Sequence, residues 1–515
     1  MLGTLRRLAS TGAAYTASSV LAKVVAVALL PVYTRFLTPA DYGAAEVLLV
    51  MVIASSIVLR VGMIEALLRF YHRADADRDA VVRTAFASLL WTTVAGSLVL
   101  ALAAEPVAAL VLGSEDAGLV RIAVFGLLVF TVYELLLALY RLDERAREYF
   151  LVTGLNVVLT IGLTVALVVG AERGAEGLLL GNFGASAVVL VGLLAVHRRR
   201  LALVPDLAVL RRLVRFGGPT VPAELSLYAL NFIDRVMLAR LAGLAEAGLY
   251  ALAVKFAQVL TVLVRGFQLA WPPLAYGIRD DREASVTYGL VVTWFVALCA
   301  FAVTGLALLS RWLVRLLAAP EFFEAWKAVP LVATGVSLYA VQLVLLVAVG
   351  RTGRTEANVP VIAVATASNV GLNALLIPPL GIVGAGIALI ASYLVMLVGL
   401  VLVTRRLFPV ALQWIRLAAA VGFAGALVVI GELLAGDEGV VAFAIRSGLW
   451  LTYPALLAIS GFLTPEERAA VAGIPPRVRA WRDSRDAPGS PATDQAPLPA
   501  PYEAEVRDED EAAGS

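Results

Sequence analysis

Long hydrophobic runs recur along the chain as far as about residue 463, and short polar or Gly- and Pro-containing breaks separate them. A helix of roughly 20 residues crosses the hydrocarbon core of a bilayer, so each run predicts one transmembrane helix. The pattern therefore predicts an all-α polytopic membrane protein. We count about fourteen runs, with approximate bounds 13–37, 42–69, 84–111, 119–140, 150–171, 177–196, 218–241, 246–274, 286–308, 328–350, 357–377, 382–404, 415–435 and 440–463.

Composition agrees with this prediction and narrows the choice of partners. Hydrophobic residues make up 61% of the chain and charged residues 16%, with a mean hydropathy of +0.88, which is outside the range of soluble domains. The net charge of +2 gives no reason to expect nucleic acid. A lone cysteine, Cys299, and two dispersed histidines provide neither a disulfide framework nor a cluster of metal ligands. We expect no metal and no other cofactor.

Basic residues mark one side of the membrane. If fourteen helices are counted, the Arg clusters between the runs all fall on the same side as both chain termini, so the positive-inside rule predicts that both termini are cytoplasmic. The stretch from Arg311 to Lys327 is the exception on the opposite side. The clusters lie at 6–7, 69–83, 141–147, 198–215, 279–282, 351–354 and 405–406.

The two halves of the chain repeat each other. At an offset of 205, RFLTPADYG from Arg35 lies over RLAGLAEAG from Arg240, and the same register places Arg60 over Arg265. Six helices in each copy give both copies the same orientation in the membrane. We therefore predict two pseudo-repeated six-helix bundles plus two C-terminal helices. The predicted parts are a first lobe at 1–196, an amphipathic cytoplasmic connector at 197–217, a second lobe at 218–404, two additional helices at 405–463 and a disordered cytoplasmic tail at 464–515.

Charged residues inside the predicted helices are the candidate functional groups, because each costs about 2.5–3.5 kcal/mol on insertion scales and usually faces a cavity or a partner. Lys255, Gln258 and Arg265 share one helix face. As residues lining a substrate pathway we select Lys23, Arg60, Asp234, Arg235, Lys255, Gln258 and Arg265, and as possible coupling acids Glu134, Glu224 and Asp234. The alternatives are that Arg60 and Arg265 extend to the headgroups and that the others form ion pairs between helices.

Three segments resemble a known family. PVYTRFLTPADYGAAEVL, LRVGMIEALLRFY and NFIDRVMLARLAGLAEAGLYALAVKFAQ are similar to the polysaccharide transport proteins, the O-antigen and exopolysaccharide flippases of the multidrug/oligosaccharidyl-lipid/polysaccharide exporter superfamily. The resemblance covers about residues 10–460. It implies a fold like that of the multidrug and toxic compound extruders and a multi-pass protein of the bacterial cytoplasmic membrane.

The resemblance further implies a flippase that moves undecaprenyl-pyrophosphate-linked oligosaccharide to the outer leaflet, with membrane lipid around it and a polysaccharide polymerase and glycosyltransferases as possible partners. A basic pathway suits pyrophosphate. An enzyme is not expected, because the longest loop on the outer side, at 309–328, has few and mixed charges. A lipid II flippase and a multidrug exporter of the same fold are the alternatives.

Overall fold

A computed structural model describes residues 27–468 except 73–76, 115 and 466. The described chain is built from helices. They are α2 (Leu30–Phe36), α3 (Pro39–Leu59), α4 (Met63–Phe70), α5 (Arg78–Leu102), α6 (Ala104–Val111), α7 (Ala117–Leu142), α8 (Ala146–Val165), α9 (Gly174–His197), α10 (Leu207–Gly217), α11 (Thr220–Leu241), α12 (Leu244–Gly277), α13 (Asp281–Leu317), α14 (Val329–Arg351), α15 (Val359–Leu407), α16 (Trp414–Leu434) and α17 (Gly439–Ile459), with short helical turns at Ala166–Gly170, Arg198–Arg200, Pro320–Lys327 and Thr355–Asn358.

The chain divides into two compact units, Met1–Ala455 and Leu456–Ser515. The first contains every helix named above except the last residues of α17. In the second, the described residues include a turn in which the Thr464 amide donates to Glu467 and the Glu467 amide donates to Thr464. Most of the tail predicted at 464–515 lies outside the described residues.

Eleven described segments are long and apolar enough to cross a membrane, so the predicted number of fourteen is not established. Most of the predicted first run, 13–37, lies outside the described residues. α11 is not among the eleven, and it carries Glu224, Asp234 and Arg235. α15 is included once although its backbone is not helical at Gly381.

α15 is a helical hairpin around Gly381. A Cβ placed on Gly384 would lie 2.1 Å from the carbonyl oxygen of Leu376, and one on Gly399 would lie 2.9 Å from Val361. Eight residues of straight helix span about 12 Å, so these contacts require two antiparallel arms. The arms correspond to the predicted runs 357–377 and 382–404.

The continuous helix predicted at 42–69 is wrong, because the chain breaks after α3. Val61 and Gly62 both have positive φ, 49° and 66°, and α4 begins only at Met63. The left-handed backbone at Gly62 lies against Gly217 at the end of α10, where a Cβ on either glycine would come within 2.2 Å of the other's carbonyl oxygen. Arg60 therefore caps α3 instead of lying within a helix.

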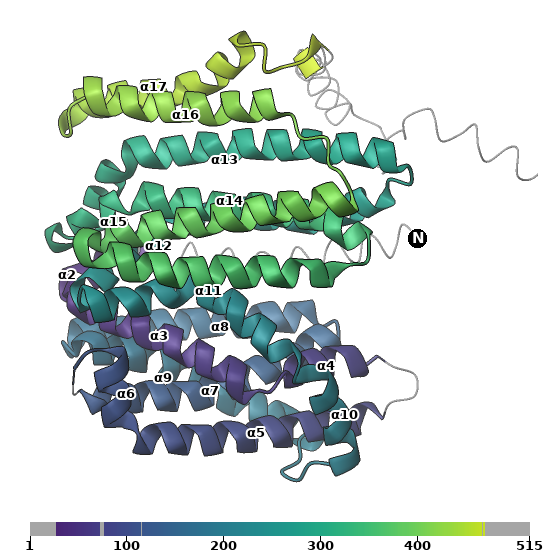
Figure 1. Ribbon diagram of the computed structural model, residues 1–515. Helices are drawn as coiled ribbons and strands as arrows, with labels where there is room; N and C mark the ends of the chain where they lie inside the picture. The colour runs from purple at the N-terminus through teal and green to yellow at the C-terminus, as the bar shows by residue number, and fades with distance from the viewer. Residues whose placement is uncertain (1–26, 73–76, 115, 466, 469–515) are drawn as a thin grey trace, which may run out of the picture. The chain divides into compact units, whose positions relative to one another are not determined.

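The two halves meet where α3 crosses α12 at a pair of repeat-matched glycines. A Cβ on Gly43 would lie 1.9 Å from the carbonyl oxygen of Leu244, and a Cβ on Gly248 would lie 1.9 Å from that of Pro39. Gly43 and Gly248 are 205 residues apart, and so are Pro39 and Leu244. The contact is thus reciprocal, and it confirms the register of the predicted repeat. Figure 1 shows α3, in purple, passing beside the teal α11, with which it also packs.

Asp41 and Glu246, which the same register matches, occupy similar positions. The Asp41 carboxylate lies 3.5 Å from the Cβ position of Gly174 at the start of α9, and the Glu246 carboxylate accepts from the amide of Ile382 at 3.0 Å. Gly174 and Gly381 both have a φ of 53°. Each acidic residue thus lies where a helix begins after a left-handed glycine, a position in which the helix dipole favours negative charge.

The remaining helices pack around these halves. Within the predicted connector, α10 lies against α4 and α5, with Leu213 fully buried and Leu207 76% exposed. α16 packs on α13, and in α17 the Trp450 indole donates to the Phe301 carbonyl of α13 at 2.9 Å.

The glycine crossing leads to a stability prediction. Gly43→Ala and Gly248→Ala should each lower the free energy of unfolding by roughly 1–3 kcal/mol or more, because the added methyl meets a backbone oxygen that cannot rotate away. Gly192→Ala in α9 is the matched control, since nothing lies within 4 Å of its Cβ position. Thermal unfolding of the purified proteins in detergent measures the difference. Equal melting temperatures for all three variants would contradict the crossing.

Candidate functional site

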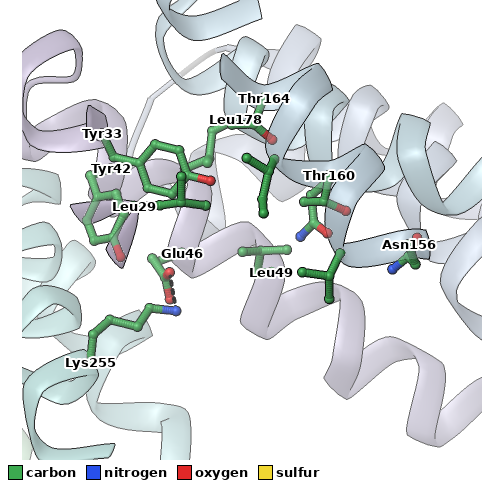
Figure 2. A pocket seen from close by; sticks show the side chains of 13 residues that line it. Leu29, Tyr33, Tyr42, Glu46, Leu49, Asn156, Thr160, Thr164, Leu178 and Lys255 are labelled. Atoms are coloured by element: carbon green, nitrogen blue, oxygen red, sulfur yellow. Dashed lines mark ion pairs between the residues drawn. The ribbon is translucent and has the colours of Figure 1, made fainter. Parts of the chain in front are cut away.

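An ion-pair cluster joins the two halves next to the glycine crossing. Glu46 of α3 accepts from Lys255 of α12, with Nζ 2.8 Å from Oε1, and the Arg235 guanidinium of α11 lies 4.0 Å from the other carboxylate oxygen. Glu46 and Arg235 are buried, and the Tyr42 hydroxyl is within hydrogen-bonding reach of Glu46. Figure 2 shows Glu46 and Lys255 facing each other at the edge of a cavity.

Helix geometry explains why these residues meet. Glu46 follows Gly43 by three residues and Lys255 follows Gly248 by seven, and both spacings keep a residue on the same helix face. Side chains on the faces that touch at the glycines must therefore face each other one or two turns farther along. An ion pair is the arrangement that makes two such charges tolerable in a bilayer.

Asp234 lies beside this cluster but has different partners. Its carboxylate accepts from the Tyr250 hydroxyl at 2.6 Å and from the amide of Arg235 at 2.9 Å. One turn earlier, Asn231 accepts from the Tyr393 hydroxyl of α15 at 2.7 Å. Asp234 is 3% exposed, so it is a buried acid held by a hydroxyl between α11 and α12.

Arg60 belongs to a second charged group at the other end of α3. Its guanidinium forms an ion pair with Glu224 of α11, which again links the two halves. Glu134 of α7 is within electrostatic reach of Arg60, and Glu65 is within reach of Glu224. Of the three possible coupling acids, two thus gather around Arg60, whereas Asp234 lies in the other group.

Arg265 differs from its repeat partner Arg60. It is exposed and forms no ion pair with any described residue, although Tyr339 lies within its electrostatic reach. Gln258, on the same face of α12, is half-buried. Lys23 lies outside the described residues. The predicted basic residues are therefore not equivalent, because Arg60, Arg235 and Lys255 have carboxylate partners and Arg265 has none among the described residues.

A polar cavity of about 230 Å³ opens beside Glu46 and Lys255. Its described lining comes from the region of α2, from α3, α8 and α9, and from Lys255 of α12. The residues are Leu29, Tyr33, Tyr42, Glu46, Leu49, Asn156, Val157, Thr160, Ile161, Thr164, Leu178, Asn182 and Lys255. Figure 2 shows the labelled side chains around the open space.

Most of this lining is absent from the predicted pathway residues. Glu46 lies only one turn after the polar segment TPADYG, where a charge is common at a helix end, and it is not among the predicted residues. Asn156, Thr160 and Thr164 follow one another at intervals of four in a hydrophobic run, and that spacing was a signal of one polar helix face.

A further set of ion pairs explains the exceptional basic stretch near Arg311. Arg311 pairs with Glu432 and Asp437 and lies 4.0 Å above the Trp326 ring. Arg446, which is completely buried, donates to Glu432 at 2.6 Å and to Asp437 at 3.2 Å. Acidic residues at the α16–α17 turn thus compensate the arginines of α13 and fasten the last helices to it. We assign these residues a structural role.

A separate network of hydrogen bonds involves the basic segment at 198–215. Arg200 donates to Asp143 and to the Tyr71 hydroxyl, both at 2.6 Å, and Tyr71 donates to Asp143. Burial raises the pKa of the Asp143 carboxyl, but the hydrogen bonds from Tyr71 and Arg200 outweigh burial and leave that pKa below its usual value. The network connects the ends of α4, α7 and α9.

Two further features of the described residues limit the chemistry of the site. Among the residues the structure describes, no group of three or more His, Cys, Asp and Glu side chains could hold a metal ion. The larger cavity, about 870 Å³, is a groove with an almost wholly apolar lining from α13, α14, α15 and α16, with Arg405 among its polar residues. The polar cavity beside Glu46 is therefore the better candidate for binding a hydrophilic ligand.

The Glu46 cluster leads to a second prediction. Glu46→Gln should lower the free energy of unfolding by roughly 3–5 kcal/mol, because Lys255 and Arg235 lose their buried counter-charge. Adding Lys255→Met should recover part of the loss, and the two single variants together with the double variant give a coupling energy from thermal unfolding. Glu438→Gln is the matched control: its exposed pair with Arg315 should contribute only about 0–1 kcal/mol. Additive effects at Glu46 and Lys255 would contradict the pairing.

Comparison with known proteins places the chain in a family. A family model described as "Polysaccharide biosynthesis protein" matches residues 32–328, which is more than half of the chain. The succinoglycan biosynthesis transport protein ExoT of Rhizobium meliloti (strain 1021) is 26% identical over 316 residues, a match that covers 59% of this chain and 61% of that protein. The match thus spans less than two thirds of this relative's length.

Solved structures share the fold. The lipid II flippase MurJ in an inward closed conformation superposes with a TM-score of 0.69 at 10% identity, covering 87% of this chain and 99% of MurJ. A multidrug resistance MATE family transporter of the MOP superfamily in an inward-facing conformation has a TM-score of 0.61 at 16% identity, covering 75% and 94%. These likenesses confirm the predicted MATE-like fold of a multi-pass membrane protein. Together with the motifs and the family match, they lead to one conclusion: the chain belongs to the polysaccharide biosynthesis protein family.

Proposed function

We propose that the protein is a flippase that moves an undecaprenyl-pyrophosphate-linked oligosaccharide from the cytoplasmic to the outer leaflet by alternating access. The observation that carries the proposal is the charged cluster of Glu46, Lys255 and Arg235 between the two halves. Family membership and the succinoglycan biosynthesis transport protein among the relatives support it. In this proposal the repeat unit is an O-antigen, capsule or exopolysaccharide unit.

The ion pairs suggest how the substrate would shift the balance between two states. A ligand changes a conformational equilibrium only if it binds the two states differently. Pyrophosphate carries more negative charge than one carboxylate, so it can compete with Glu46 for Lys255 and Arg235 and thereby weaken a contact between the halves. Arg265, which has no carboxylate partner among the described residues, is free to meet the phosphate first. The prenyl chain stays in the surrounding lipid.

Arg265 therefore provides the first functional test. Arg265→Ala should reduce export of the glycan by roughly 10- to 100-fold, which corresponds to the loss of one charged hydrogen bond of about 1.5–3 kcal/mol. Lys23→Ala should act in the same direction. Arg121→Ala is the control, because Arg121 is exposed at the start of α7 outside both charged groups. Full export by Arg265→Ala at a normal protein level would count against a basic pathway.

The most direct measurement of the function is glycan export in a strain that lacks the gene. Lipid-linked intermediates are quantified and assigned to a leaflet, and the wild-type gene is returned as the control. Intermediates held on the cytoplasmic side and released by the returned gene are the expected result. Accumulated peptidoglycan precursor would instead identify a lipid II flippase. Unchanged glycan with altered drug tolerance would identify a multidrug exporter.

An ion gradient can drive such a cycle, and the buried acids are the groups through which it would act. Asp234, Glu134 and Glu224 each lie near an arginine, so adding a proton or a cation at one of them alters the charge balance between the halves. If transport depends on a gradient, that dependence should disappear in Asp234→Asn, Glu134→Gln or Glu224→Gln. The assay is export before and after an ionophore collapses the gradient, with Glu438→Gln as control. Gradient dependence that persists in all three variants would exclude them as coupling groups.

We place the protein in the bacterial cytoplasmic membrane with both termini in the cytoplasm, because the basic segments then face the cytoplasm. A polysaccharide polymerase and glycosyltransferases are the expected partners, since they make and consume a lipid-linked repeat unit. The protein itself is proposed to catalyse no covalent step, in keeping with a family and structural neighbours that are transporters.

A further inference from the structure

α8 carries a polar stripe in the middle of an otherwise apolar membrane span. Asn156, Thr160 and Thr164 all line the cavity beside Glu46, although the helix segment that contains them is apolar enough to cross a membrane. Polar side chains in such a helix are retained where they meet protein, water or a ligand. The stripe therefore marks a surface that is not adapted to lipid.

α9 packs beside α8 and extends this surface. Asn182 lines the same cavity, and Ser186, one turn later, donates to the Asn156 side-chain oxygen at 3.2 Å. The Asn182 amide and the Thr160 hydroxyl make no side-chain hydrogen bond to another described residue. These two groups thus leave donors and acceptors available to a ligand in the cavity.

The charges in the described lining of the cavity cancel each other. Glu46 and Lys255 are the charged residues in its described lining, and they form an ion pair with each other at 2.8 Å. The face formed by α8 and α9 contributes amides and hydroxyls without a cation. A phosphate would find no counter-charge on that face, whereas a neutral ligand with many hydroxyl groups would find both donors and acceptors.

Two aromatic rings and the size of the cavity further limit the class of ligand that can bind. Tyr33 and Tyr42 line the cavity on the side away from Asn156 (Figure 2), and an aromatic ring packs well against the C–H face of a sugar ring. A volume of about 230 Å³ is below the roughly 300–1,000 Å³ of pockets for drug-sized molecules. The cavity therefore suits one ring and is too small for a whole repeat unit.

We propose that this cavity binds one uncharged sugar residue of the transported glycan on the face formed by α8 and α9, whereas the pyrophosphate meets Lys255 at the edge of the cavity. The inference rests on the proposed flippase function and adds to it the class of sugar that the N-terminal half recognises. Asn182 and Thr160 hydrogen-bond the ring hydroxyls, Asn156 extends the polar surface, and Tyr33 packs on the ring. A uronic acid is disfavoured because Glu46 repels its carboxylate and no free cation in the described lining compensates it.

Cysteine labelling tests this site in the full-length protein. Cys299 is the chain's one cysteine and is buried, so Cys299→Ala provides a background in which Thr160→Cys reports on the cavity. Ala171→Cys, at an exposed residue outside the cavity lining, is the matched control. The rate of reaction with a small thiol reagent is measured with methyl α-D-glucopyranoside, N-acetylglucosamine, glucuronate or inorganic pyrophosphate.

A neutral glycoside should protect position 160 and leave position 171 unchanged. One ring is expected to bind with a dissociation constant on the order of millimolar, so a concentration ten times higher should slow labelling about tenfold. Asn182→Leu in the same background should abolish the protection, and Asn182→Ala repeats the test without added bulk. Size-exclusion chromatography verifies that each variant is folded.

Three results would overturn the proposal. They are no protection by either neutral probe, equal protection by glucuronate or pyrophosphate, and a cysteine at 160 that does not react, since a sugar cannot enter where a small reagent cannot. The experiment contains no transport step, so its failure is distinguishable from failure of the flippase function. Export that continues normally while neither neutral sugar protects position 160 would remove the sugar site and retain the flippase.

Discussion

The close approach of α3 and α12 at Gly43 and Gly248 is the constraint on which the arrangement of the two halves depends. Each glycine lies against a backbone carbonyl of the other helix, and no side chain fits in that space. Because the two glycines occupy the same position in the repeat, the contact also fixes how one copy faces the other. Residues one or two turns beyond the crossing are then brought together whatever their chemistry.

One or two turns beyond the crossing, the two copies of the repeat carry different residues at matched positions. By the offset of 205, Glu46 corresponds to Ala251 and Lys255 corresponds to Val50, so each half contributes a charge that the other lacks. The two charges compensate each other across the junction. In the proposed cycle the two halves separate. A polar contact between them can exchange with a charged substrate, whereas an apolar contact of the same area offers the substrate no competing interaction.

The sequence predicts the features that arise from periodicity. The hydrophobic runs predict the helical membrane fold, and the coincidence of Gly43 with Gly248 predicts the register that the crossing confirms. The sequence does not predict features that depend on a local backbone conformation or on a residue far along the chain. The break at Val61 and Gly62 depends on the approach of Gly217, which lies far along the chain. Glu46 becomes notable only when Lys255 and Arg235 are found beside it, and Lys23 lies outside the described residues.

The two halves share a fold but differ in the chemistry of their cavities. The N-terminal half supplies most of a small polar cavity lined by Asn156, Thr160 and Asn182, whereas the C-terminal helices enclose a larger apolar groove. The repeat-matched arginines also differ, because Arg60 is paired with Glu224 and Arg265 has no carboxylate partner among the described residues. In the proposed function, a neutral sugar of the substrate matches the cavity and the charged pyrophosphate matches the arginines, while the hydrocarbon chain stays in lipid. A repeated fold with unequal halves can hold such a molecule in one orientation, because exchanging its ends would place hydroxyl groups against hydrocarbon.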